Sequence, residues 1–375
     1  MLRIDNLSHW EKNSYFRNLD FVVIGSGIVG LSTAIFLKHR YKDSRVLVLE
    51  RGYLPTGAST KNAGFACFGS PTELFDDLKS IDESVVWDTF SKRYFGLQTL
   101  FNLISRDQID YDQCMSWDLI SSNQDNKITP DFINYINEKA YQITGKQNMY
   151  YEDPSIASRF GFQKVNTSYC NSIEGSIDTG KLIKELHKQA ILHDVMVLFG
   201  IEAQDLESSE HGNIINTTFG EIHANKCIIA TNGFAKRWTT EDILPARAQV
   251  VITNEIPDLK IKGTFHIEKG YYYFRNVNNR ILLGGGRNLD ISGETTEDFG
   301  LTQQIQDKLT ELLKNVILPE QRFEITDSWS GIMGVGKSKS PIVKKIDDNT
   351  AIGVRLGGMG VAMGSQVGKT LSSLF

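Results

Sequence analysis

Apolar residues along the chain fall into short uninterrupted runs and into segments where they recur at helical spacing. The run at 21–24 is aromatic or β-branched throughout, which is typical of a strand buried on both faces. Three glycines follow, and apolar residues then recur at helical spacing over 31–37. Residues 45–50 read RVLVLE, a second buried strand that ends in a carboxylate. The pattern predicts strand, turn, helix and strand within about 30 residues, the size of a βαβ unit.

The same periodicities predict the elements that follow. Residues 80–143 look largely helical, with apolar positions interrupted by polar ones. Asp178 is placed to cap a helix over 179–194, and residues 302–317 form another amphipathic helix. A strand is expected at 195–199, followed by a β-meander around Gly220 that closes with a strand at 226–230. Most of 247–287 is expected to form strands, with a turn at 277–280. Short strands then precede a helix that begins near 364.

Composition narrows the class of protein. A length of 375 residues suggests two or three domains. The composition never shifts sharply along the chain, so we expect these domains to be interleaved. A net charge of −5 supplies no electrostatic footprint for nucleic acid, which we exclude as a partner.

The cysteines and the longest apolar run bear on localisation. Cys67, Cys114, Cys170 and Cys227 are scattered, with no metal-ligand spacing, so we expect no metal site and reduced thiols in the cytoplasm. The longest apolar run, 21–37, is shorter than the ~20 residues that a membrane span needs. We therefore expect no membrane span.

The glycine turn is the strongest chemical motif. Gly25, Gly27 and Gly30 have the spacing GxGxxG between a buried strand and a helix, and Glu50 lies 20 positions beyond Gly30. In such a turn the first glycine permits the tight bend, the second lets a pyrophosphate approach backbone N–H groups, and the third lets the helix pack on the strand. A carboxylate at Glu50 can accept hydrogen bonds from ribose hydroxyls, which disfavours NADP. The turn predicts a dinucleotide but does not distinguish NAD from FAD.

Four further segments carry a resemblance that separates the two cofactors. Residues 57–65 read GASTKNAGF, 228–234 read IIATNGF, 327–343 contain a Trp-x-Gly, and 356–371 begin LGGMG. In this order they resemble the D-amino-acid-oxidase-like flavoprotein oxidoreductases, which include glycine oxidase, sarcosine oxidase and γ-glutamylputrescine oxidase. The resemblance extends over nearly the whole chain and implies FAD.

The resemblance also implies a fold and a set of cofactor residues. It implies a mixture of α/β and α+β: a Rossmann-type FAD-binding domain (1–80, 151–245 and 325–375) interleaved with a mixed-sheet substrate domain (81–150 and 246–324). Glycines at the last segment would expose N–H groups to a flavin carbonyl just before a helix. The residues expected at the cofactor are Gly25, Gly27, Ile28, Gly30, Glu50, Arg51, Ser59, Asn62, Ala63, Gly64, Ala203, Thr231, Gly233, Gly357, Gly358, Met359 and Gly360.

The substrate side is expected on a hairpin at 270–287. With a period of two, Tyr271, Tyr273 and Arg275 share one face, and Tyr272 and Phe274 share the other. Two phenols and a guanidinium suit a polar pocket, and the resemblance aligns Tyr271 with the family's pocket tyrosine. Aromatic cross-strand packing with Arg275 reaching solvent would explain the same pattern. Trp329 and Met333, of the Trp-x-Gly segment, complete the expected substrate pocket.

Three departures from the family matter. The arginine that follows Trp-x-Gly in amino-acid-oxidising members is absent here, so a substrate carboxylate is held by Arg275, Arg247 or Lys337, or the substrate is an amine without one. No cysteine follows Cys227, so FAD is expected to be non-covalent. The lysine that sarcosine-oxidase relatives use for oxygen falls at Leu282 or Leu283, which leaves O₂ and a quinone or carrier open as electron acceptors.

The resemblance implies an enzyme that oxidises the C–N bond of a small amine or amino acid. Hydride transfer to flavin N5 would give an imine, which then hydrolyses. Two alternatives stay open: an FAD-dependent 2-hydroxyacid or related alcohol dehydrogenase, and a flavin-bearing subunit of a hetero-oligomer. No histidine is assigned as a catalytic base: His266, near the hairpin, is the best placed of them, but the sequence favours a hydrogen-bonded structural role for it.

Overall fold

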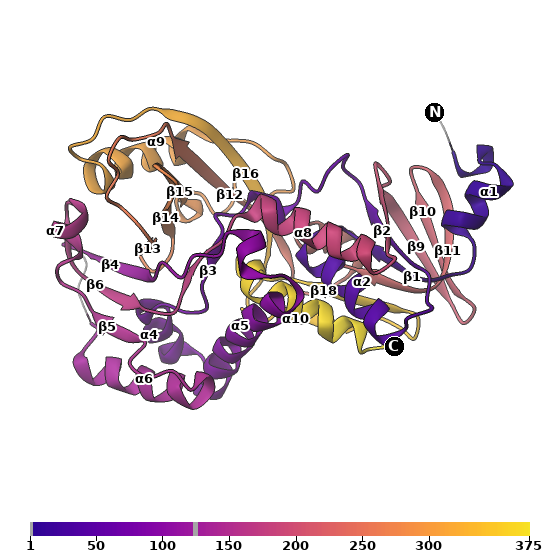
Figure 1. The fold of residues 1–375 in the computed structure, drawn as a ribbon, viewed down its shortest axis with the longest axis horizontal. Coiled ribbons are helices and arrows are strands. Elements are labelled where there is room, and N and C mark those ends of the chain that lie inside the picture. The colour runs from indigo at the N-terminus through magenta and orange to yellow at the C-terminus, as the bar shows by residue number, and fades with distance from the viewer. Residues whose placement is uncertain (1–2, 123–126) are drawn as a thin grey trace.

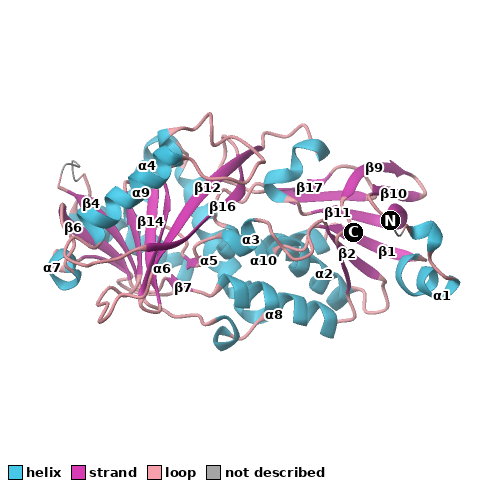
Figure 2. Cartoon of the chain, turned by 90° about the horizontal axis from the view of Figure 1, so that it is seen from above, coloured by secondary structure: helices cyan, strands magenta, loops and turns pink. Residues whose placement is uncertain are grey.

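Two large β-sheets, one toward each end of the molecule, form the frame of the protein (Figure 1). The structure is a computed structural model that describes residues 3–122 and 127–375. Within these residues each large sheet has eight strands. Between the two sheets Figure 2 shows helices that include α2 (Ile28–Arg40), α3 (Ala58–Lys61), α5 (Glu83–Leu103) and α10 (Gly360–Ser372).

The first sheet is parallel at its centre. Its strands are β1 (Leu19–Ile24), β2 (Val46–Glu50), β8 (Met196–Phe199), β9 (Ala203–Ser209), β10 (Gly212–Thr217), β11 (Gly220–Ile229), β17 (Ile342–Lys345) and β18 (Thr350–Val354). β18, β11, β1, β2 and β8 run parallel in that order, and β9 and β10 form an antiparallel meander with β11. Every residue of β2 is buried, because apolar residues of α2 and α8 pack on one face of the sheet and those of the meander pack on the other. The parallel pairing of β1 with β2 and the antiparallel pairing of β9, β10 and β11 confirm the predicted βαβ unit and meander.

Helices pack closely around the glycine turn. α10 lies against α2 and α5, and a Cβ atom on Gly368 would lie 2.7 Å from the backbone nitrogen of Thr33. α8 (Thr179–Leu192) packs on α2, and its first turn is capped by Asp178, which accepts a hydrogen bond from Lys181 N at 2.9 Å. This contact confirms the predicted cap. α10 begins at Gly360, earlier than the expected start near 364, because the glycine turn at 357–358 leads directly into it.

The second sheet is mixed. Its order is β16–β12–β15–β14–β13–β4–β6–β5, with β13 and β4 parallel and the other neighbours antiparallel. Its strands are β4 (Ser116–Ser121), β5 (Tyr150–Glu152), β6 (Val165–Asn171), β12 (Leu244–Thr253), β13 (Thr264–Ile267), β14 (Tyr272–Val277), β15 (Arg280–Gly285) and β16 (Ile325–Val335).

The two faces of the second sheet differ in chemistry. One face belongs to an apolar core, in which the rings of Phe265 and Phe274 stack 4.6 Å apart and Trp117 stacks on Phe265. Helix α9 (Gln303–Leu312) adds to this core, which confirms most of the predicted helix at 302–317. Tyr272 also lies in this core, so the predicted separation of Tyr272 and Phe274 from Tyr273 is confirmed.

Residues 80–143 differ from the expected helical region. They contain α5 and most of α6 (Pro130–Thr144), but β4 lies between them and pairs with β13 and β6. Polar and apolar residues alternate over 116–119 (SWDL), but this stretch is too short to be distinguished from the helical segments on either side of it. The remaining α-helices and strands are α1 (His9–Glu11), β3 (Phe65–Ala66), α4 (Pro71–Ser80), α7 (Ile156–Phe160) and β7 (Gly175–Ser176).

The expected domain limits do not coincide with sheet membership. β6 and β16, and most of β5, fall in segments that the sequence analysis gave to the FAD-binding domain, but they pair in the second sheet. These segments cross between the two halves of the molecule, and strand pairing rather than position in the chain decides where they belong. The division into two interleaved domains stays a prediction. Sheet membership places β5, β6 and β16 in the second, substrate domain instead of the FAD-binding domain.

Candidate functional site

The glycine turn is held tightly between two strands. Gly25 follows β1 with φ +107°, and its N–H donates to Leu49 O at 2.8 Å. A Cβ atom on Gly25 would lie 2.8 Å from Ala230 O, and one on Gly30 would overlap Gly25 O. Only glycine suits Gly25, because positive φ and a close backbone meet at one residue. Gly30, in the first turn of α2, is also required to be glycine, because the carbonyl oxygen of Gly25 occupies the place of a Cβ atom.

Ser59 meets the start of α2. Gly27 is the N-cap of this helix, and the hydroxyl of Ser59 accepts a hydrogen bond from Ile28 N at 3.0 Å. A Cβ atom on Gly27 would lie 2.8 Å from that hydroxyl oxygen. The first N–H groups of a helix have no intrahelical partner and favour an anion, so this end of α2 can hold a phosphate group.

Glu50 sits at the end of β2 beside the turn. Its carboxylate is buried and accepts hydrogen bonds from Ser26 N (3.2 Å), Ser26 Oγ (2.7 Å) and Gly52 N (3.0 Å). These donors fix both oxygens in place. Glu50 also lines the cavity described below, where its remaining acceptor capacity is available to a hydroxyl.

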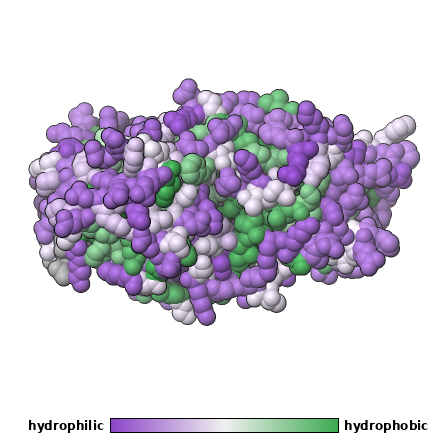
Figure 3. All heavy atoms as spheres, turned by 90° about the horizontal axis from the view of Figure 1, so that it is seen from below, coloured by the Kyte–Doolittle hydropathy of each residue, from purple (hydrophilic) through white to green (hydrophobic). Residues whose placement is uncertain are grey.

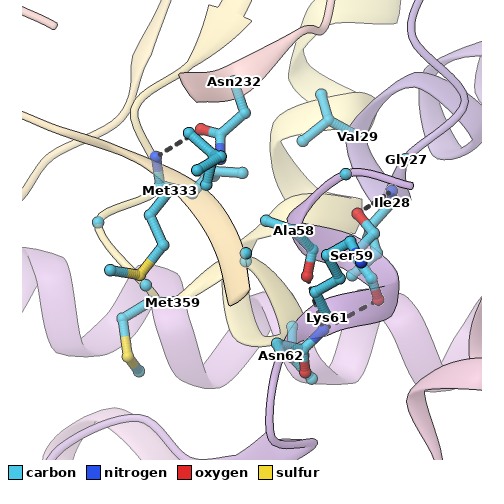
Figure 4. A pocket seen from close by; sticks show the side chains of 18 of the residues that line it. Gly27, Ile28, Val29, Ala58, Ser59, Lys61, Asn62, Asn232, Met333 and Met359 are labelled. Carbon is cyan, nitrogen blue, oxygen red and sulfur yellow. Dashed lines mark hydrogen bonds between the residues drawn. The ribbon is translucent and has the colours of Figure 1, made fainter. Parts of the chain in front are cut away.

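A second glycine turn faces the first from α10. Gly357 and Gly358 have φ of +56° and +84°, and Gly357 N donates to Gly334 O at 3.0 Å. The first turn of α10 has no side-chain cap. In Figure 4, Met333, Met359 and Asn232 lie across the hollow from α2 and α3.

One cavity of about 470 Å³ joins these parts and continues to the second sheet. Figure 3 shows apolar side chains gathered around the middle of one face of the molecule, between more polar ends. Sixteen of the residues expected from the sequence line this cavity. They are Gly25, Gly27, Ile28, Glu50, Arg51, Ser59, Asn62, Ala63, Ala203, Thr231, Gly357, Gly358, Met359, Gly360, Tyr273 and Met333.

Three expected cofactor residues support the cavity from outside it. Gly30 packs on the glycine turn, as described above. Gly64 has φ +75°, and a Cβ atom on it would overlap Ile177 O. Gly233 packs on β16, where a Cβ atom would lie 2.6 Å from Met333 O. At each of these positions a backbone atom lies too close to the place of a Cβ atom for any residue but glycine. The sequence alone does not predict the contacts of Gly64 and Gly233, whose neighbours lie far along the chain.

Three expected substrate residues also lie outside the cavity lining. Tyr271 precedes β14 and is 53% exposed. Arg275 shares a face with Tyr273 but is buried beneath Gly64, to whose carbonyl it donates at 3.5 Å. Trp329 donates from Nε1 to Lys61 O at 3.0 Å and packs with Ala63. Arg275 and Trp329 therefore support the segment at the cavity wall.

A family model described as "FAD dependent oxidoreductase" (DAO) matches residues 20–374. The chain belongs to this family of FAD-dependent oxidoreductases. The protein is thus an oxidoreductase with FAD as its cofactor, and the resemblance noted in the sequence is confirmed. "Probable oxidoreductase OrdL" from Rhizobium meliloti (strain 1021) is 22% identical over 372 residues, covering 96% of this chain and 83% of that protein.

Solved structures share the fold of this FAD-dependent oxidoreductase. Glycine oxidase from Bacillus cereus ATCC 14579 has a TM-score of 0.73 at 17% identity, covering 95% of this chain and 94% of that one. L-proline dehydrogenase from P. horikoshii has 0.74 at 18%, covering 95% and 93%. Iminodiacetate oxidase from Chelativorans sp. BNC1 has 0.74 at 15%, covering 94% of each chain. The expected fold class is confirmed.

The residues present fit FAD. Gly25 and Gly27 leave space that a Cβ atom would fill, and the adjoining start of α2 suits the pyrophosphate. Glu50 lines the cavity beside the turn and keeps acceptor capacity that a ribose hydroxyl would satisfy. Thr231 lines the cavity with a buried hydroxyl oxygen that has no hydrogen-bond partner, which a polar ligand would satisfy. Bound FAD supplies the electron acceptor for oxidation of a substrate.

The flavoenzyme's cavity has a charged far wall that sequence reasoning missed. Glu73 of α4 accepts hydrogen bonds from Arg93 of α5 at 3.1 Å and from Lys339 at 2.9 Å. Burial raises the pKa of Glu73, but Arg93 and Lys339 outweigh it and lower the pKa to about 2. The only local signal is Ser70 followed by Pro71, which predicts a helix start but no cavity wall.

Two groups near this wall have altered protonation. Burial raises the pKa of the Cys67 thiol, which also lines the cavity. Glu174 lies behind the wall and accepts hydrogen bonds from Phe68 N (2.6 Å) and Gly69 N (3.0 Å). Burial raises its pKa to about 7 despite those bonds. Cys67 is therefore a neutral thiol near pH 7, whereas Glu174 is about half ionised there.

Two general expectations concern metals and membranes. Across residues 3–122 and 127–375, no group of three or more histidine, cysteine, aspartate and glutamate side chains is arranged to hold a metal ion. Over the same ranges, no helix combines the length and apolar character needed to cross a bilayer.

Proposed function

We propose that this FAD-dependent oxidoreductase oxidises the C–N bond of a small amine or amino acid to an imine, which water then hydrolyses. The observation that carries the proposal is the continuity of one cavity. The glycine turn and Glu50 line one part of it, and Tyr273, His266 and Met333 line another. A substrate on the second part would lie against the reacting end of a dinucleotide placed on the first.

The chain's own contribution is orientation and exclusion of water. Phe65, Ala63, Met333 and Met359 give that part of the cavity an apolar lining, and Tyr273 adds a phenol whose pKa burial raises to about 12. A substrate held among these groups loses its hydration and is presented in a fixed pose. Tyr273 stays a hydrogen-bond donor over the working pH range.

The positions of the cations favour an amine without a neighbouring carboxylate. Arg247 is tied to the buried Glu294 at 2.8 Å, and Arg275 is buried beneath Gly64. Lys337 lines a smaller cavity instead. The three cations suggested for a carboxylate are thus absent from the main cavity. The lysines and arginines that do line it already have partners: Arg93 and Lys339 pair with Glu73, Lys269 with Asp76 and Arg237 with Glu202, while Arg51 and Lys61 lie over the rings of Phe234 and Phe299.

We further propose that the cofactor is bound without a covalent bond and that electrons pass to O₂ or to a quinone or carrier. Cys67 is the one cysteine of the four that lines the cavity, and burial raises the pKa of its thiol, which disfavours the nucleophilic thiolate. Release of FAD on acid or heat denaturation tests this part directly.

Anaerobic visible spectroscopy of the FAD-loaded protein tests the reaction. We expect one class of amines to bleach the flavin absorbance, with amino acids weaker, and 2-hydroxyacids to leave it unchanged. Bleaching by 2-hydroxyacids and by no amine would replace the proposal with alcohol oxidation. Activity only with a co-purifying subunit would indicate a component of a hetero-oligomer. Admitting air afterwards separates an oxidase from a dehydrogenase.

A further inference from the structure

Three polar side chains lie in one row across the second sheet. Asp118 of β4 is in register with His266 of β13, and His266 is in register with Tyr273 of β14. The alternate residues Trp117 and Phe265 belong to the core behind the sheet. Because side chains in register on neighbouring strands share a face about 5 Å apart, Asp118, His266 and Tyr273 are consecutive neighbours.

His266 and Tyr273 are the members of the row that line the substrate part of the cavity, and His266 is the one that can accept a proton. Its ring lies 5.2 Å from that of Phe65, and Nδ1 is 3.5 Å from Ser116 Oγ, which leaves Nε2 for another partner. Among the described residues that line the main cavity, it is the only histidine. An imidazole at this place is exposed to the substrate.

Asp118 is buried directly behind His266. It is 2% exposed, and its Oδ2 accepts a hydrogen bond from Thr72 N at 2.9 Å, at the start of α4. Its other oxygen, Oδ1, is buried without a partner. A buried carboxylate with an open acceptor is costly unless a neighbouring group can become positively charged, and His266 is the adjacent group in the row.

We propose that His266 accepts the proton of the substrate ammonium and that Asp118 is the positioning residue that stabilises the resulting imidazolium. The inference rests on the proposed amine oxidation. Aliphatic ammonium groups titrate near pH 10, so an amine reaches the protein protonated. Transfer of the proton to Nε2 breaks an N–H bond of the ammonium and leaves its electron pair on the substrate nitrogen. That lone pair is what loss of hydride from the adjacent carbon requires.

The surrounding groups are consistent with this role. Burial lowers the pKa of His266, while Asp118 and Glu73 of α4 act in the opposite direction. Burial likewise raises the pKa of Asp118, opposed by Thr72 and His266. Glu73 is itself paired with Arg93 and Lys339. Tyr273 from β14 and Cys67 beside β3 stay neutral, since burial raises the pKa of each. His266 is therefore unprotonated near neutral pH, as a proton acceptor must be, and Asp118 offsets part of the loss of basicity that burial causes.

The test compares His266→Gln and Asp118→Asn with the wild-type holoenzyme. The rate of anaerobic flavin bleaching by an amine is followed from pH 6 to 10, after FAD content and thermal unfolding of each variant are checked. We expect His266→Gln to lose about 100-fold at pH 7 and to recover toward the wild-type rate as the pH approaches the pKa of the amine. His223→Gln removes an exposed histidine on β11 and serves as the matched control, with an unchanged profile.

A second readout does not depend on turnover. Proton NMR of the FAD-loaded protein follows the titration of the His266 imidazole, assigned by its loss in His266→Gln. We expect Asp118→Asn to shift that titration to lower pH, because it removes the neighbouring negative charge. If His266→Gln folds poorly, His266→Asn replaces it for assigning the His266 signal, and the NMR comparison still tests the role of Asp118.

The outcomes separate the two proposals. If no amine bleaches the wild-type flavin, the proposed function fails, and the proton-transfer role fails with it. If amines bleach the wild type but His266→Gln keeps the wild-type pH profile, only the role of His266 is overturned. An unmoved His266 titration in Asp118→Asn overturns the positioning role of Asp118.

Discussion

Two glycines of the same turn, Gly27 and Gly30, are expected to fail in different ways when alanine replaces them. A Cβ atom on Gly30 would overlap Gly25 O and lie 3.0 Å from the carbonyl carbon of Gly25. Both neighbours are backbone atoms of a turn held by the Gly25 N to Leu49 O bond, so neither can move alone. Overpacking of this kind costs about 3 kcal/mol, against about 1 kcal/mol gained from the helix propensity of alanine. Gly30→Ala should thus lower the free energy of unfolding by about 2 kcal/mol.

Gly27→Ala meets a side chain instead of backbone. Its Cβ would lie 2.8 Å from Ser59 Oγ, and φ at Gly27 is an ordinary −77°. Ser59 can rotate away at the cost of its hydrogen bond from Ile28 N, about 1 kcal/mol. The same methyl group would occupy the space where a pyrophosphate approaches the N-terminus of α2, so FAD affinity should fall at least about tenfold.

Urea unfolding of the FAD-free proteins measures the first quantity, and quenching of flavin fluorescence on titration measures the second. Ser59→Ala combined with Gly27→Ala removes the clash within the protein, so the double variant should regain space without regaining affinity. If Gly30→Ala unfolds at the same urea concentration as the wild type, the inference that the backbone of Gly25 excludes a Cβ atom at position 30 is refuted. Equal losses of stability in Gly27→Ala and Gly30→Ala would also refute the distinction.

Three further changes test other parts of the site. Glu50→Gln replaces charge-assisted hydrogen bonds by neutral ones and should weaken FAD binding about five- to tenfold, measured by flavin fluorescence. Trp329→Phe leaves Lys61 O without its donor and should cost about 1–2 kcal/mol in urea unfolding, with FAD still bound. Glu73→Gln leaves the buried Arg93 charge uncompensated and should cost about 3 kcal/mol at pH 7. Because the pKa of Glu73 is lowered in the folded state, its contribution is complete above about pH 4.5 and is lost as the pH falls toward 2, so the two unfolding curves should converge in acid.

Much of the cofactor half could be predicted from the sequence. Residues 21–24 and 45–50 are short buried runs beside a glycine turn, and their strand and helix assignments follow from local periodicity alone. The Asp178 cap was predictable for the same reason, since a helix start is encoded within about four residues. Most of the expected cofactor residues line the cavity because they belong to such local motifs.

The far wall could not be predicted, because its members are brought together only by long-range contacts. Glu73, Arg93 and Lys339 come from α4, α5 and the segment after β16, and none has a neighbour in the sequence that indicates the others. β4 was expected to be helical for a related reason: its partners β13 and β6 lie far along the chain. Strand pairing at such separations is decided by the whole fold.

The sequence by itself determined the turn, the residues that share a face, and the family to which the chain belongs. Period two placed Tyr273 and Arg275 together and Phe274 opposite, which the structure keeps. Only the tertiary structure decided that Tyr273 faces the cavity while Arg275 is buried beneath Gly64. Alternation fixes the side of a strand from which a side chain emerges, since it follows from the local backbone. What covers that side is set by segments packed from elsewhere in the chain, and this packing put His266 in the cavity with Asp118 behind it.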